Sequence, residues 1–224
     1  MKMLKATTLK FIKDIEKNNN KSWFEANRKK YEDAKLDFET FVQRIIDGFG
    51  KKEPDIAALT AKQTTFRINR DVRFSKDKSP YKNNMGSYMS RGGKKSIFAG
   101  YYIHCQPGKS FVGGGLWMPQ PAELGRLRQE IDYNTDEFKS IVESKKFRSV
   151  YDGLSKDAEY TLVRVPKGYE ADNPAAEYLK FKSYVALTPL TDAELTSKDG
   201  ERKILKAFET LQPLITFINR AIQD

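Results

Sequence analysis

The spacing of the apolar residues changes twice along this chain, and that change limits the fold more than any other feature. In the N-terminal part, large apolar side chains recur every seven positions: Phe24, Tyr31, Phe38 and Ile45. This spacing is typical of an amphipathic helix that faces a core. Apolar and polar residues then alternate through the middle of the chain, as in strands, and helical spacing returns from Ile204 to Ile218. We expect an α+β fold: a mainly antiparallel β-sheet with helices packed against it, and long amphipathic helices at the N-terminal and C-terminal ends.

Local signals place the individual elements. Ser22-Trp23-Phe24-Glu25 has the form of a capping box, which predicts one long helix from Ser22 to the glycines at 48 and 50, after a short first helix that ends at Asn18. Strands are expected at six places: 66–74, 85–90, 97–105, 111–118, 160–165 and 181–187. Further helices are expected at four: 124–131, 135–142, 175–179 and 204–218. The links between the central strands are short, with a turn at Pro107-Gly108, which favours antiparallel neighbours.

Composition excludes several classes of protein. The 224 residues show no repeat and no Pro/Ser-rich linker, so we expect a single domain over 1–224. One Cys excludes a disulfide framework and one His excludes a His-pair metal site, so we expect no metal and no cofactor. No apolar run approaches the roughly 20 residues that span a bilayer, and no apolar segment of a signal peptide follows the start. We therefore expect a cytoplasmic protein without a membrane partner, whose oligomeric state the sequence does not indicate.

Positive charge is concentrated in one stretch. The formal net charge is +10 and the isoelectric point is near 9.4. Between Arg67 and Lys95 there are nine basic and two acidic residues, which is most of the excess. The rest of the chain is nearly balanced. A local excess of this kind favours an anionic partner, whereas net charge alone bears mainly on solubility.

Residues 67–82 combine this charge with an unusual pattern. On a strand, Arg67, Asp71 and Arg73 share one face, whereas Arg70 falls on the apolar face. A guanidinium is rarely buried unless it is paired. We therefore expect either that Arg70 has a carboxylate partner, with Asp77 as the candidate, or that the strand breaks near Asp71.

We interpret this segment as the binding site of a small anionic ligand, because guanidinium forks suit phosphate and carboxylate groups and lysines add point charge. The candidate ligand-binding residues are Arg67, Arg70, Asp71, Arg73, Lys76, Asp77, Lys78, Tyr81, Lys82 and Trp117. The two carboxylates would orient the guanidiniums. A purely structural Arg–Asp network, which pins an irregular crossing to the sheet, has the same charge signature.

Two other functions stay open. An enzyme acting on a phosphorylated substrate would draw its acid–base groups from Asp71, Asp77 and Tyr81, although pairing with arginine lowers the pKa of a carboxyl group and weakens it as a base. No catalytic residue is assigned. Nucleic acid is a second candidate partner, because the basic loop 91–95, with Tyr88 and Trp117 nearby, would contact phosphates and stack bases.

Two further motifs give little indication of function. His104 and Cys105 are neighbours on an expected strand, so their side chains point to opposite faces and cannot form a catalytic dyad. The glycines at 113–115 match neither a P-loop nor a dinucleotide fingerprint. We expect facing aromatic residues, Tyr101 and Tyr102, to cover these glycines. The alternative is a ligand that approaches the bare backbone.

The string at 67–82 resembles the signature of an uncharacterised family, domain of unknown function 2461. Three more stretches are similar to that family: Asn18–Phe24, Gly113–Pro119 and Arg164–Tyr169. Together the four stretches span most of the chain. The resemblance implies a single full-length domain, and it implies no reaction, cofactor or catalytic residue.

Overall fold

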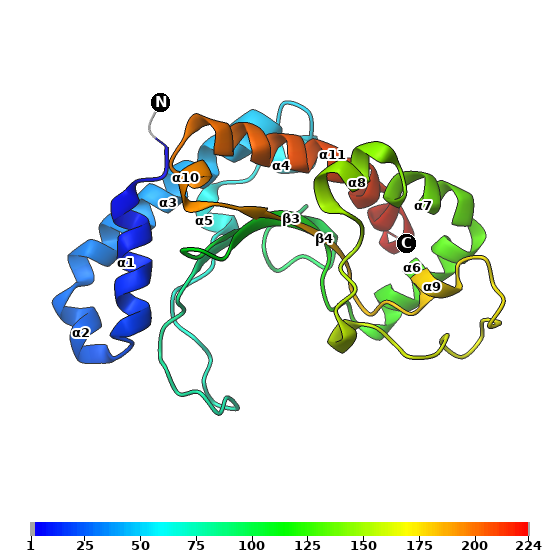
Figure 1. The fold of residues 1–224 in the computed structure, drawn as a ribbon, viewed down its shortest axis with the longest axis horizontal. Helices are drawn as coiled ribbons and strands as arrows, with labels where there is room; N and C mark the ends of the chain where they lie inside the picture. The colour runs from blue at the N-terminus through cyan, green and yellow to red at the C-terminus, as the bar shows by residue number, and fades with distance from the viewer. Residues whose placement is uncertain (1–2, 224) are drawn as a thin grey trace. The chain divides into compact units, whose positions relative to one another are not determined.

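The computed structural model describes residues 3–223, which divide into two compact units (Figure 1). The first unit consists of three segments: the chain through Lys94, 102–112 and 189–206. The second consists of the other three: 95–101, 113–188 and the chain from Ala207 onward. Among the described residues, no helix is both long and apolar enough to cross a membrane.

Four strands form one antiparallel sheet whose order in space, β1-β2-β3-β4, repeats their order in the chain. Their bounds are β1 (Met85–Met89), β2 (Gly100–Cys105), β3 (Ser110–Leu116) and β4 (Tyr184–Leu190). Pro107 and Gly108 make the turn between β2 and β3, with Gly108 at a φ of 72°, a conformation that favours glycine. The predicted α+β fold is confirmed, with long helices near both ends of the chain.

The described part of the first unit contains six helices, of which α3 is the longest: α1 (Ala6–Lys17), α2 (Lys21–Ala26), α3 (Arg28–Phe49), α4 (Pro54–Ala57), α5 (Ala61–Thr64) and α10 (Asp192–Leu195). Helix α1 packs along α3, and Ile12 and Ile15 of α1 and Phe41 of α3 are buried. Figure 1 shows this pair in blue. The seven-residue stripe faces the core as predicted, because Phe38 and Ile45 are also buried.

The prediction of one long helix that begins at Ser22 is wrong at its N-terminal end. Helix α2 begins one residue earlier, and its N-cap is Asn20, whose side chain accepts a hydrogen bond from the Trp23 amide. The helix then breaks at Asn27. The Asn27 side chain donates to the Trp23 carbonyl at 2.9 Å, and such local bonds compete with helical ones. Two nearby asparagines therefore decide this boundary.

The second unit holds four helices and one 3₁₀ turn: α6 (Pro121–Tyr133), α7 (Thr135–Val142), α8 (Lys145–Tyr151), α9 (Ala176–Leu179) and η1 (Ala158–Tyr160). Helix α11 (Lys198–Ile222) begins in the first unit and ends in the second. In the second unit it packs on the sheet, where the Tyr101 and Phe208 rings lie 4.9 Å apart. The strand predicted at 160–165 is wrong: a single bridge, Thr161 to Phe181, replaces it.

The strand predicted at 66–74 is also wrong. Residues 65–87, named here the basic hairpin, pair through two isolated antiparallel bridges, Thr65 to Ser87 and Asn69 to Tyr81. Between residues 70 and 80 no ladder forms, because side chains take over the backbone groups: the Lys78 ammonium donates to the Val72 carbonyl at 3.0 Å. Figure 1 shows this part of the hairpin as an extended loop.

Candidate functional site

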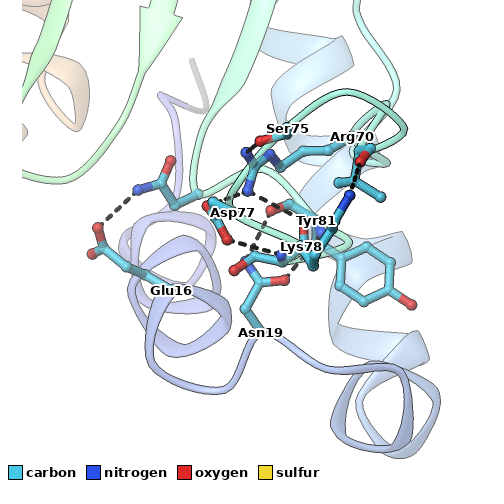
Figure 2. A network of polar contacts seen from close by, with 10 residues as sticks. Glu16, Asn19, Arg70, Ser75, Asp77, Lys78 and Tyr81 are labelled. Carbon is cyan, nitrogen blue, oxygen red and sulfur yellow. Dashed lines mark hydrogen bonds and ion pairs between the residues drawn. The ribbon is translucent and has the colours of Figure 1, made fainter.

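Arg70 and Asp77 form the centre of a polar network in the basic hairpin (Figure 2). The Arg70 guanidinium contacts the Asp77 carboxylate and donates to the Ser79 carbonyl at 3.2 Å. The Ser79 amide donates to the same carboxylate at 2.9 Å. Hydrogen bonding by the Ser79 hydroxyl, then by the Ser79 amide and by Arg70, lowers the pKa of Asp77 to about 2. The predicted carboxylate partner of Arg70 is confirmed, and the regular pairing also ends near Asp71.

Asp71 and Arg73 form a second pair, closer to the tip of the hairpin. The Arg73 Nε and Nη2 groups donate to the two carboxylate oxygens at 3.0 and 2.7 Å. This fork lowers the pKa of Asp71. Lys78 reaches back to the carbonyls of Val72 and Arg73. Four of the candidate residues, Arg70, Asp71, Arg73 and Asp77, are therefore paired with one another, and their bonds hold the loop in shape.

The hairpin is anchored to the first helices by Asn19, which the sequence analysis did not single out as a site residue. Its side chain accepts a hydrogen bond from the Tyr81 amide at 3.0 Å and donates to the Tyr81 carbonyl at 2.8 Å (Figure 2). The Tyr81 ring is buried and stacks on Phe24 with ring centroids 4.1 Å apart. Burial also raises the pKa of Tyr81. The only signal for Asn19 was its place in a run of turn-forming asparagines.

Four candidate cations are left without an ion pair, and one of them, Lys78, donates to backbone carbonyls instead. The other three make no side-chain hydrogen bond in the described part of the chain. In the described part of the chain, no carboxylate pairs with Arg67, Lys76 or Lys82. The Lys82 ammonium is half-buried and lies 5.2 Å from the centroid of the Phe66 ring. Burial and the nearby charge of Arg67 both lower the pKa of Lys82. The Lys82 amide also donates to the Ile68 carbonyl at 2.8 Å, so Arg67 and Lys82 are two neighbouring positive charges at the base of the hairpin.

The last candidate, Trp117, belongs to the second unit. Its ring is 54% exposed and packs edge-on against Tyr160 at 4.5 Å. Of the loop at 91–95, Lys94 is committed to the fold of the first unit, because its ammonium donates to the Thr65 carbonyl at 2.7 Å. Tyr88 is only partly exposed, and burial raises the pKa of its hydroxyl.

His104 and Cys105 lie on opposite faces of β2, as predicted. The thiol is fully buried, and burial raises its pKa to about 12. The imidazole lies between the Tyr102 hydroxyl at 3.0 Å and the Gln106 side chain at 3.1 Å. Because a thiol with this pKa stays protonated near neutral pH, it is not a nucleophile. Residues 3–223 hold no group of three or more His, Cys, Asp or Glu side chains placed to bind a metal ion.

Neighbouring strands lie very close to the glycines of β3, on the side where a Cβ atom would stand. A Cβ atom on Gly113 would lie 2.0 Å from the Ala186 carbonyl oxygen of β4, and one on Gly114 would lie 2.1 Å from the Gly100 carbonyl oxygen of β2. The backbones of the neighbouring strands fill the space. The Tyr102 hydroxyl lies over a different glycine, Gly86 of β1.

Comparison with known proteins gives one match. The model of a family described as a conserved hypothetical protein, DUF2461, matches residues 7–217. The match therefore includes residues of both units. No curated protein and no solved structure matches the chain.

Proposed function

Since the chain belongs to the DUF2461 family, whose description names no activity, we propose from its own geometry that it is a binding module for a phosphate- or carboxylate-bearing ligand. The ligand is held on the basic hairpin. Arg67 and Lys82 at the base of the hairpin are its principal contacts, and Lys76 near the tip is a further one.

One observation carries this proposal: Lys82 lies beside Arg67 at the hairpin base, where its amide donates to the Ile68 carbonyl at 2.8 Å, and among the described residues neither cation has an acidic partner. Two like charges repel, and the repulsion is stronger where one of them is partly removed from water. An anion between them would replace repulsion by attraction and supply hydrogen-bond acceptors to both. The Arg70–Asp77 and Arg73–Asp71 pairs support the site by fixing the loop, so its cations are placed before the ligand arrives.

The same geometry favours binding over catalysis. A general base at neutral pH needs a pKa near 7, whereas those of Asp71 and Asp77 are lowered. Tyr81, the third acid–base candidate, is buried against Phe24. We also infer a cytoplasmic location, because the single Cys is a buried free thiol and the fold uses no disulfide.

Thermal unfolding in phosphate tests the proposal. A ligand that binds only the folded state raises the melting temperature, and the rise grows with the ratio of ligand concentration to Kd. At constant ionic strength, we expect millimolar phosphate or pyrophosphate to raise the Tm of the wild-type protein, and Arg67→Gln and Lys82→Gln to lose most of that rise. Lys51→Gln, an exposed lysine outside the hairpin, is the control and keeps the rise. An unchanged wild-type Tm with every anion tried would falsify the proposal.

A further inference from the structure

Phe74, near the tip of the basic hairpin, is the most exposed large apolar side chain described in the structure, at 95%. Its position is not the result of a loose loop. The residue before it, Arg73, is held by the Asp71 carboxylate, and the carbonyls of Val72 and Arg73 accept bonds from Lys78. The turn therefore presents an aromatic ring to solvent on a backbone that is already ordered.

A second exposed aromatic ring on the same hairpin also has a cation next to it. Phe66 is 41% exposed and carries the Lys82 ammonium at 5.2 Å, just as Phe74 carries the Arg73 guanidinium at 5.8 Å. The two residues are eight positions apart, so at about 3.3 Å per residue their Cα atoms are separated by at most about 26 Å. The hairpin thus bears an aromatic–cation pair at its base and another at its tip, with Lys76 beside the tip pair.

We propose that the basic hairpin binds single-stranded nucleic acid, with bases stacked on Phe74 and Phe66. The inference rests on the proposed function, because Arg67, Lys76 and Lys82 hold the backbone phosphates. Proteins that bind single strands combine cations along the path of the phosphates with aromatic rings on which bases stack. Phe74 and Phe66 supply the rings, and the unpaired cations follow the same hairpin.

The placement of charge favours a single strand over an anionic membrane. A membrane surface would meet the tip, where Arg70 and Arg73 are already paired with Asp77 and Asp71 and leave few free charges for anionic headgroups. Arg67 and Lys82, which have no acidic partner among the described residues, lie at the base of the hairpin and would not contact the membrane. A flexible single strand of nucleic acid would follow the hairpin from tip to base and contact both aromatic–cation pairs.

Fluorescence anisotropy with labelled oligothymidylate at low salt tests this inference. We expect Phe74→Ala and Phe74→Leu each to weaken binding at least about 5-fold, since both remove the stacking face, and Phe74→Trp to keep it. Leu36→Ala, another exposed apolar side chain of the first unit, is the control and changes nothing. Lys76→Gln should reduce the slope of log affinity against log salt by about 0.7, the value for one phosphate contact in a single strand.

The outcomes separate this inference from the proposed function. Absence of oligonucleotide binding together with a retained phosphate-induced rise in Tm rejects the strand and leaves the anion site standing. Binding of the Phe74→Leu variant at wild-type strength also rejects base stacking. Sedimentation with phosphatidylserine vesicles tests the membrane alternative. If the protein binds vesicles, needs an apolar residue at position 74 to do so, and does not bind oligonucleotide, the tip is a membrane-binding site and the inference is overturned.

Discussion

At the scale of single residues, Asp37 is the charged side chain that the described core contains. It projects from α3 to the start of α1, where its Oδ2 atom accepts hydrogen bonds from the Lys5 amide at 2.8 Å and the Thr8 hydroxyl at 2.7 Å. The first amides of a helix have no partners within the helix. A carboxylate of one helix thus satisfies the N-terminus of another, and it ties the two together.

Asp37→Ala is expected to lower the free energy of unfolding by about 2 kcal/mol, because it leaves a buried hydroxyl and an amide without an acceptor. Urea unfolding followed by circular dichroism measures the change. Asp33→Ala is the control on the same helix: its carboxylate is exposed and pairs only with Lys29, so the change should stay below about 0.5 kcal/mol. Equal effects of the two substitutions would refute the capping role.

The pKa of Asp77 gives a second prediction at this scale. Because its folded value of about 2 lies below the ordinary 3.8, the stabilising contribution of the carboxylate is fully present above pH 3.8 and is lost as the pH falls through about 2. The carboxyl carbon should titrate near pH 2 by NMR. Ser79→Ala should raise that midpoint more than Arg70→Gln, since the Ser79 hydroxyl is the largest cause of the lowering. A wild-type midpoint near 3.8 would contradict the network.

At the scale of elements, the glycines of β3 set how closely three strands approach. Gly113→Ala places a Cβ atom 2.0 Å from a backbone oxygen of β4, and a backbone atom cannot rotate away as a side chain can. We expect a loss of at least about 3 kcal/mol in the free energy of unfolding, the upper end for overpacking. Gly125→Ala is the matched control, because a Cβ there meets nothing within 4 Å and the site lies inside α6. That substitution should stabilise the protein by about 0.5–1 kcal/mol.

Helices and central strands were predictable because their periodic apolar faces are buried, as at Phe38 and Ile103. Predictions failed where side chains compete with regular backbone pairing. Ser22 and Glu25 had the form of a capping box, but Asn20 caps the helix instead. No local pattern shows which of several capping residues will bond to the backbone.

The candidate site was predictable in part for the same reason. Arg70 on an apolar face required a carboxylate, and Asp77 was close enough in sequence to supply it. The role of Asn19 was not predictable from the sequence, since its hydrogen bonds to Tyr81 join positions 62 residues apart. The exposure of Phe74 was also missed, because alternation placed its ring on the buried face of a strand that does not form.

At the scale of the whole molecule, the question is whether the net charge of +10 acts as a diffuse field or as a local site. A diffuse field attracts polyanions according to net charge, regardless of where charges sit. Arg67 and Lys82 are adjacent and unpaired with acids, whereas Lys13 and Lys51 are exposed lysines on separate parts of the first unit. Both pairs carry the same charge, so exchanging either pair for glutamine removes equal amounts of it.

Elution from immobilised heparin distinguishes the two cases. The Arg67→Gln/Lys82→Gln double variant is expected to elute at distinctly lower salt than Lys13→Gln/Lys51→Gln, because neighbouring cations on an ordered hairpin engage one sulfate group together, and isolated lysines engage it singly. Equal elution of the two double variants would mean that only the total charge matters. In that case the hairpin pairs Arg70–Asp77 and Arg73–Asp71 would be left with a structural role alone, and the basic composition would describe the surface of the protein rather than a binding site.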